Sequence, residues 1–194
     1  IVSHEAANAK KVALADIDGD GHLDIVSISG PSTSGYVDKI SWYKNLDGLG
    51  NFGPQINIPI GIYDSPDGLV VYDVDADGDM DIVTALTNWP SAGDKIVWYA
   101  NNGTGGFASE QIIGAGPNGV TSLKNADIDN DGDFDLVCTS RLDNTIAWYQ
   151  NLNGQGSFGP KIVITSSASS VGDVAIADLD SDGDGCADAR HRRF

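Results

Sequence analysis

Residues 16–24 read Asp-Ile-Asp-Gly-Asp-Gly-His-Leu-Asp, a DxDxDGxxD pattern that is followed at once by an apolar segment. The pattern recurs at residues 73–81 and 127–135, and each copy again continues into an apolar segment. A fourth copy starts at Asp178, but Cys186 stands where its closing Asp is expected. The four starts lie 57, 54 and 51 residues apart, so the chain is built on an internal repeat.

The pattern predicts metal-binding loops. Alternate Asp side chains on a tight loop can converge on one point, and a glycine allows the sharp bend. Oxygen ligands in this number suit Ca²⁺ better than Mg²⁺, and clustered carboxylates repel one another unless a cation lies between them. We expect Ca²⁺ in the first three loops; the fourth lacks one anionic ligand, so its binding stays open. The candidate ligands, with the seventh residue of each loop counted for its main-chain carbonyl, are Asp16, Asp18, Asp20, His22 and Asp24; Asp73, Asp75, Asp77, Asp79 and Asp81; Asp127, Asp129, Asp131, Asp133 and Asp135; and Asp178, Asp180, Asp182 and Asp184.

An EF-hand does not fit these loops. Its loop closes with a Glu at position twelve and lies between two helices. Position twelve is here Ser27, Thr84, Cys138 or Ala189, and β-branched residues after the first three loops favour strands. We therefore expect the Asp at position nine to complete the cage.

Each unit is predicted to hold four short strands separated by turn residues, and almost no helix is expected, because no segment shows a 3.6-residue period. The predicted strands are 11–15, 25–29, 39–44 and 54–59 in the first unit; 68–72, 82–86, 95–99 and 109–113 in the second; 121–126, 136–139, 145–149 and 160–164 in the third; and 173–177 in the fourth. Four antiparallel strands repeated in this way are typical of β-propeller blades, which bury their faces by stacking on neighbours. We expect one all-β domain over 1–194, with blades at about 9–60, 61–115 and 116–167, a partial blade at 168–185 and a divergent, frayed tail at 186–194.

Two aromatic signals follow the same period. They are a Trp-Tyr pair at 42–43, 98–99 and 148–149, and a Phe-containing turn at 51–54, 106–108 and 157–160. Because every copy keeps its place in the unit, packing between blades is the favoured role, and ligand contact is the alternative.

Val-Ala-Leu-Ala at residues 12–15, the Asp pattern, the Trp-Tyr pair and the Phe-Gly-Pro turn together resemble the FG-GAP or VCBS type of repeat. Such repeats are found in integrin α-subunit propellers, in fungal and bacterial seven-bladed lectins and in some secreted polysaccharide lyases. The resemblance covers residues 9–184. It implies a propeller in which the loop between the first two strands of a blade holds one Ca²⁺ through the carboxylates at positions one, three, five and nine.

The chain departs from these relatives in length. They have about seven blades, and three complete units cannot close a ring. Two explanations stay open: the chain is a fragment of a longer propeller, or two or more copies complete a ring as a homo-oligomer, with the strand near 174–176 joining a neighbour's sheet.

The charge is strongly acidic. The chain has 28 acidic and 11 basic residues, and 18 of its 26 Asp lie within the four repeats. This balance argues against nucleic acid as a partner, since phosphate binding requires basic patches. No apolar run is long enough to predict a membrane span. Loops of this kind fill at the Ca²⁺ concentrations found outside cells, so we expect an extracellular, secreted or cell-surface protein.

No catalytic constellation recurs in the chain. His4, His22 and His191 are far apart in sequence, and no GxSxG, HExxH or Cys/His pattern occurs, so we expect a binding module and not an enzyme. Loops that vary between units carry Tyr36 and Trp89, which are candidates for stacking on a sugar, although Trp89 could equally pack on its own blade. The first hypothesis is a lectin-like module for a glycan or another extracellular ligand. The alternatives are a structural or adhesive repeat that contacts proteins, and a fragment of a larger secreted polysaccharide-active enzyme.

Overall fold

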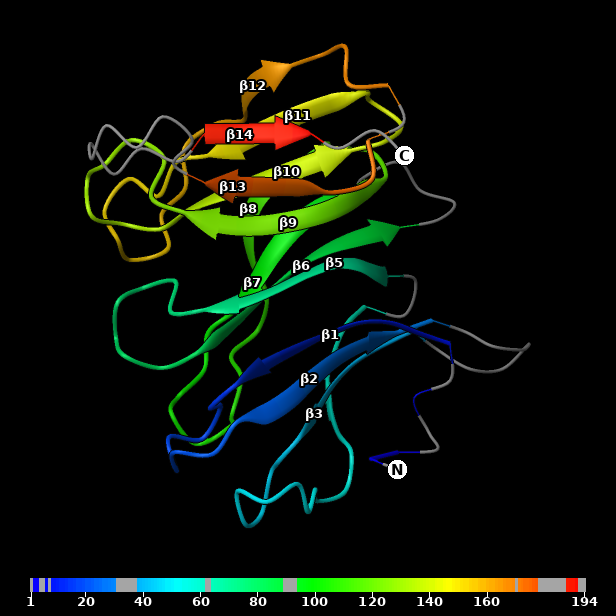
Figure 1. Cartoon of the computed structure of the whole chain (residues 1–194), viewed down its shortest axis with the longest axis vertical. Helices are drawn as coiled ribbons and strands as arrows, with labels where there is room; N and C mark the ends of the chain where they lie inside the picture. The colour runs from blue at the N-terminus through cyan, green and yellow to red at the C-terminus, as the bar shows by residue number, and fades with distance from the viewer. Residues whose placement is uncertain are drawn as a thin grey trace.

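The computed structural model describes residues 2–3, 6, 8–30, 38–61, 64–88, 94–169, 171–177 and 188–191. These residues form three four-stranded antiparallel sheets and one two-stranded sheet (Figure 1). They contain no helix, and so no helix that could cross a membrane. The predicted all-β class and the predicted four-stranded units are confirmed.

Each large sheet is a meander in which consecutive strands pair. The first sheet holds β1 (Ala9–Ala15), β2 (Asp24–Ser29), β3 (Lys39–Tyr43) and β4 (Ile56–Ile58). The second holds β5 (Asp64–Tyr72), β6 (Asp81–Asn88), β7 (Lys95–Tyr99) and β8 (Gln111–Ala115). The third holds β9 (Val120–Ala126), β10 (Asp135–Ser140), β11 (Thr145–Tyr149) and β12 (Ile162–Thr165).

The outer strands start later than the sequence predicts. β4, β8 and β12 begin two residues after the expected 54, 109 and 160. The preceding Phe forms only an isolated bridge to an Asn, as in the Asn45–Phe52 pair. Two of these turns continue with a proline, which has no N–H to donate to a ladder.

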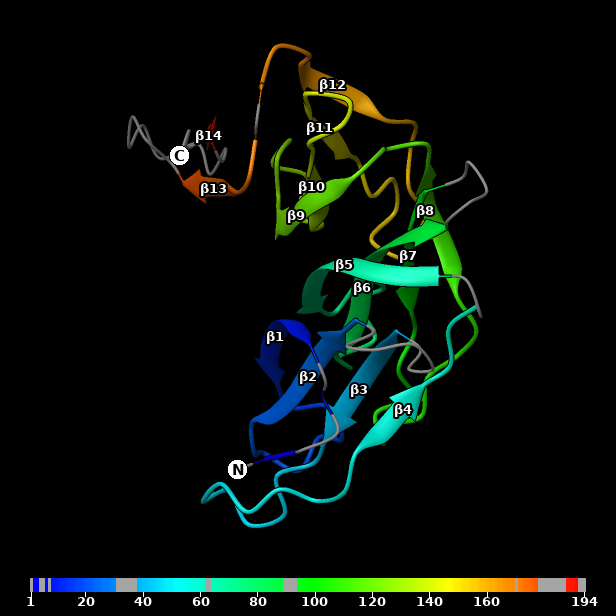
Figure 2. The same ribbon diagram turned by 90° about the vertical axis from the view of Figure 1, so that its right-hand side faces the viewer.

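The three sheets follow one another as blades of a propeller do. β1 packs against β5, β5 against β9, and β9 against β13 (Val174–Ala177), so the first strand of each unit lies on one common inner side (Figures 1 and 2). The hydrophobic core lies between successive sheets and not within one of them. This arrangement is consistent with propeller blades.

The repeated aromatic residues build the interfaces between the sheets. Trp42 of the first sheet shares a cluster with Tyr99 of the second, and Trp98 of the second shares one with Tyr149 of the third. Trp and Tyr are neighbours along a strand and therefore point to opposite sides of the sheet. The second sheet thus presents Trp98 to the third sheet and Tyr99 to the first. The predicted packing role is confirmed.

The fourth unit differs from the expectation of a single strand and a frayed tail. Residues 188–191 form β14 (Asp188–His191), which pairs antiparallel with β13. Asp188 stands opposite Ala177, the position that Asp24 takes opposite Ala15 in the first sheet. Eight residues, 16–23, separate that pair in the first sheet, whereas ten, 178–187, separate it in the fourth. By its place in the strand pairing, Asp188 and not Cys186 is therefore the counterpart of the closing Asp24.

Candidate metal centres

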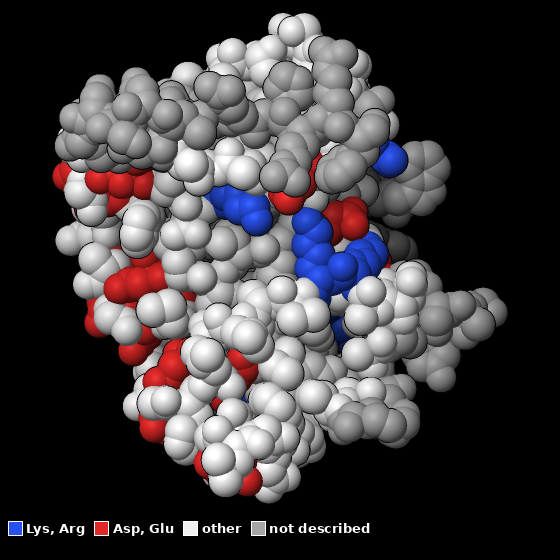
Figure 3. All heavy atoms as spheres, in the orientation of Figure 1, with Lys and Arg blue, Asp and Glu red and all other residues white. Residues whose placement is uncertain are grey.

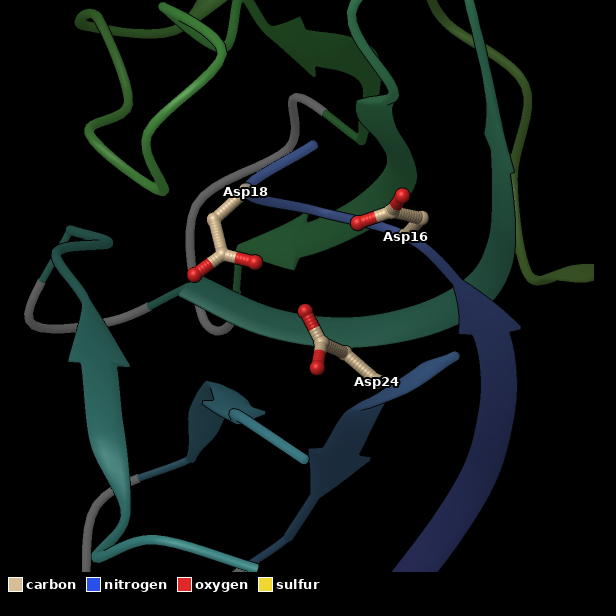
Figure 4. Close-up of side chains that lie close together, drawn as sticks. All are labelled: Asp16, Asp18 and Asp24. Carbon is tan, nitrogen blue, oxygen red and sulfur yellow. The ribbon is translucent and has the colours of Figure 1, made fainter. Parts of the chain in front are cut away.

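The three intact Asp patterns form the hairpin bends β1–β2, β5–β6 and β9–β10. In each bend, the carboxylates at positions one, three and nine converge, and one ligand atom of each lies within 4.8 Å of the other two. Figure 4 shows Asp16, Asp18 and Asp24 of the first bend directed toward a common point. The other two groups are Asp73, Asp75 and Asp81, and Asp127, Asp129 and Asp135.

The Asp at position one folds the loop. In the first bend, Asp16 Oδ1 accepts the amide of Asp20 at 3.1 Å and Asp16 Oδ2 accepts the amide of Gly21 at 2.8 Å. The same two bonds recur at Asp73 and Asp127. The glycine that donates this amide has φ +86° in the first bend, in the left-handed region that residues with a Cβ rarely adopt.

The Asp at position nine is fully buried in all three bends. Its Oδ2 accepts the amide of position two, and its Oδ1 accepts the amide of an Asn in the loop after the third strand. Burial raises the pKa of Asp81 to about 7 and that of Asp135 to about 6, although these amide bonds oppose the shift. A buried carboxylate in this position is costly without a neighbouring cation.

The donor set fits Ca²⁺. Asp18 Oδ1 and Asp75 Oδ1 are buried and have no hydrogen-bond partner, so the first and second triads each keep a free oxygen beside two other carboxylates. Burial, followed by neighbouring carboxylates, raises the pKa of Asp75 and of Asp129. Three hard, anionic oxygen donors around one point are the ligands that Ca²⁺ prefers. The three clusters are typical of calcium sites in this type of repeat.

Positions five and seven do not join the convergent triads. Asp20, Asp77 and Asp131 at position five each accept the amide of position seven, at 2.9 to 3.0 Å. At position seven, the side chains of His22, Asp79 and Asp133 lie against Gly48, Gly103 and Gly154 of the neighbouring turn. A contribution of position five, or of the position-seven carbonyl, to the cage stays a prediction.

Six predicted site residues lie outside the described residues. They are the fourth-loop residues Asp178, Asp180, Asp182 and Asp184, and the two candidate ligand-stacking aromatics Tyr36 and Trp89.

The three bends differ in the residue that follows the Trp-Tyr pair, which is Lys44, Ala100 or Gln150. The Lys44 ammonium pairs with Asp18 and lies 3.0 Å from Asp20 Oδ2, which raises the pKa of Lys44 and lowers that of Asp20. Gln150 Nε2 lies 2.5 Å from Asp129 Oδ2. Ala100 has no polar group to offer. The sequence analysis missed this residue, although its place beside the Trp-Tyr pair was a usable signal.

A cleft of about 520 Å³ runs beside β7, between the first and second sheets. Its polar wall contains Lys95, whose Nζ lies 2.5 Å from Glu110 Oε1 and 3.4 Å from Asp64 Oδ2. Ile60 and Phe107 line its apolar side. The hydroxyl of Tyr99, another lining residue, is buried without a hydrogen-bond partner. The cleft therefore offers donors, acceptors and apolar surface together.

A family model described as FG-GAP-like repeat matches three segments of the chain, residues 16–84, 85–138 and 127–185. A search of curated proteins gave no significant match. The matched segments include all three convergent triads and span most of the chain.

Proposed function

The chain belongs to the FG-GAP-like repeat family, and on that premise we propose that it is an extracellular recognition module whose loops bind Ca²⁺ and whose blades bind a glycan. A binding role is proposed in place of a catalytic one, because the chemistry that the sequence repeats is that of metal ligation. The observation that supports calcium most directly is the buried, unpartnered oxygen of Asp18 and of Asp75 inside their triads.

The proposed role of the bound ion is structural. The ion supplies positive charge that offsets the mutual repulsion of the carboxylates in each bend. Residues of the chain hold the loop in place. The Asp at position one accepts backbone amides of the loop, and the Asp at position nine accepts a backbone amide of the next turn of the same sheet. The hairpin bends are thereby held in the shape that the blade requires.

Calcium content tests this proposal. Metal analysis after dialysis against millimolar Ca²⁺ should find about three ions per chain, and Asp75→Asn should lose one of them. Asp79→Asn is the matched control, since it removes the same charge from the same loop at a side chain that lies against Gly103. A chain without calcium, or equal losses in both variants, would overturn the assignment.

The cleft beside β7 is the proposed glycan site. Sugars present hydroxyls and apolar ring faces together, and such ligands suit a concave site with a few placed polar groups. Lys95 and Glu110 supply a donor and an acceptor at the wall of the cleft. A glycan array with the calcium-loaded protein, repeated in EDTA, tests this. Lys95→Met should weaken the signal, whereas Lys124→Met, which removes the same charge from β9 outside the cleft, should not. Absence of binding to any sugar would refute the glycan proposal and leave the calcium proposal standing.

A second candidate function is contact with a protein, including another copy of this chain. The outer strand β12 exposes Ile162, Val163 and Ile164 in succession, with 40%, 49% and 46% of each residue accessible. An exposed apolar edge of this kind can add a strand from a partner. Light scattering separates the cases: a mass above that of one chain supports self-association, and a monomer that captures no sugar supports a different protein partner.

A further inference from the structure

Three buried asparagines connect the metal loops to the turns that follow the third strands. The backbone amides of Asn45, Asn101 and Asn151 donate to the Oδ1 atoms of the closing Asp residues of their own sheets, at 2.7, 2.8 and 2.9 Å. These bonds hold each closing Asp from the side opposite its own loop. The position of each asparagine is therefore tied to the geometry of the adjacent metal site.

Two of these asparagines also reach the preceding sheet. Asn101 Nδ2 donates to the carbonyl of Ile17 at 2.7 Å, and Asn151 Nδ2 donates to the carbonyl of Val74 at 3.1 Å. Ile17 and Val74 occupy position two of the preceding metal loops. Their own amides donate to the Oδ2 atoms of the closing Asp residues there, at 3.2 and 2.9 Å.

These bonds form one continuous path through the three metal loops. It runs from Asp24 through Ile17 and Asn101 to Asp81, and from Asp81 through Val74 and Asn151 to Asp135. Every residue on the path is buried, the three Asp residues fully. Water does not compete with hydrogen bonds in such surroundings, and a member that loses its partner is left unsatisfied at a cost. A change of geometry at one loop is therefore resisted at the next.

We propose that calcium binding is positively cooperative between adjacent loops, and that Asn101 and Asn151 transmit the coupling. The inference rests on the proposed calcium binding and specifies how the sites regulate one another. A metal-free loop is loosened by the repulsion of its carboxylates, whereas an occupied loop fixes its closing Asp and its position-two carbonyl. That carbonyl holds the Asn of the next sheet, whose amide then presets the next closing Asp. The second loop therefore loses less conformational entropy when it binds calcium, which strengthens its binding. Stacked repeats that interact only with their nearest neighbours behave in this way.

The first sheet supplies a matched control. Asn45 Nδ2 donates to the Leu23 carbonyl within its own sheet at 3.1 Å, as Asn101 Nδ2 does to Met80, also at 3.1 Å. The bond from Asn101 to Ile17 has no counterpart at Asn45 among the hydrogen bonds of the described residues. Asn45→Ala thus removes the bond within the sheet, and Asn101→Ala removes the same bond together with the bond between the sheets.

The test is a calcium titration of the metal-free full chain by isothermal calorimetry. We expect a Hill coefficient above 1 for the wild type, with neighbouring sites strengthening one another by about tenfold. Asn101→Ala should keep the number of bound ions but lower the Hill coefficient and weaken the average affinity several-fold, and Asn45→Ala should retain the wild-type cooperativity. Independent sites in the wild type, or equal effects of the two variants, would overturn the coupling while leaving calcium binding intact. A chain that binds no calcium would instead refute the proposed function.

A second measurement covers the case in which Asn101→Ala does not fold. Asp129→Asn removes a carboxylate ligand from the third loop, and this residue does not contact the second loop. Hydrogen exchange of the Val74 amide then reports the second loop, because this amide bonds Asp81. With coupling, the calcium concentration that protects Val74 rises several-fold in Asp129→Asn. An unchanged concentration means that the loops fill independently and the proposal is wrong.

Discussion

The ammonium nitrogen of Lys11 in β1 lies 2.6 Å from the carbonyl oxygen of Thr121 in β9, 110 residues further along the chain. This bond joins the first sheet to the third across the inner side of the second. Lys10 beside it donates to Ser65, Pro66 and Asp67 of β5. Figure 3 shows basic groups gathered over this inner face, whereas acidic groups line the edge that carries the hairpin bends. Lys10 and Lys11 thus connect the sheets away from the acidic hairpin bends.

Lys11→Met should lower the free energy of unfolding by about 1–2 kcal/mol, because it leaves the Thr121 carbonyl without its charged donor. Urea denaturation at constant Ca²⁺ measures the change. Lys124→Met is the control, since Lys124 is exposed on β9 and its loss changes the net charge equally. If both variants lost the same stability, general charge repulsion and not the Lys11 bond would be responsible.

Lys44→Ala should strengthen calcium binding at the first loop by about fivefold. The Lys44 ammonium lies against Asp18 and Asp20, where it competes with a bound cation. Calcium titration at low ionic strength measures the effect, which salt should reduce. Gln150→Ala removes a neutral neighbour of Asp129 and should change the affinity of the third loop less. A weaker first site in Lys44→Ala would show that Lys44 supports the loop.

In EDTA, the free energy of unfolding should fall as the pH rises from about 4 to 7. Burial raises the pKa of Asp81 to about 7 and of Asp135 to about 6 in the folded chain, so the folded state holds protons that an unfolded carboxyl has already released. Each group contributes up to about 1.4 kcal/mol per pH unit in its window. Urea unfolding at a series of pH values measures the slope.

Asp81→Asn should flatten this dependence, since the amide carries no titrating proton. Saturating Ca²⁺ should reverse the slope, because the ion favours the charged carboxylates. A metal-free chain that became more stable as the pH rose through this range would contradict the assignment of the raised pKa values to these buried groups.

Gly105→Ala should destabilise the fold more than Gly50→Ala. Both glycines have positive φ, +79° and +94°, and so share the backbone cost of about 1 kcal/mol. A Cβ at Gly105, however, would come within 2.3 Å of the Trp42 ring, whereas a Cβ at Gly50 meets nothing within 4 Å. Overpacking adds about 1–3 kcal/mol at Gly105. Thermal unfolding of the two variants compares them, and equal melting temperatures would mean that the sheets separate to admit the methyl group.

Much of the fold and of the metal sites could be predicted because both depend on short, local patterns. The Asp-Gly loop sets its own bend, and the period of the Trp-Tyr pair marks the third strand of each unit. The convergence of Asp16, Asp18 and Asp24 follows from their spacing alone. The same spacing places the position-five Asp near the cage; its Oδ1 accepts a backbone amide of the loop, and its contribution to the cage stays a prediction.

The residues that could not be predicted from the sequence make contacts with residues far away in the chain, beyond the length of the repeated pattern. Asn101 stands directly after the Trp-Tyr-Ala segment, yet its partner Ile17 lies 84 residues away in the preceding sheet. The pairing of β14 was missed for a related reason: the fourth loop is longer, so a fixed count placed its end at Cys186, whereas the ladder places it at Asp188. In both cases the register of the sheets decides what the spacing leaves open.

The opposite directions of Trp and Tyr in each sheet give the stack a polarity. The second sheet packs its Trp against the next sheet and its Tyr against the previous one. A further copy of residues 61–115 inserted in tandem would therefore have a complementary surface on both sides. Such a chain can gain or lose whole units by duplication or deletion, because each new interface would use the same Trp and Tyr contacts. Repeat number is therefore an easily altered trait in this architecture, while the order of faces within a unit is fixed.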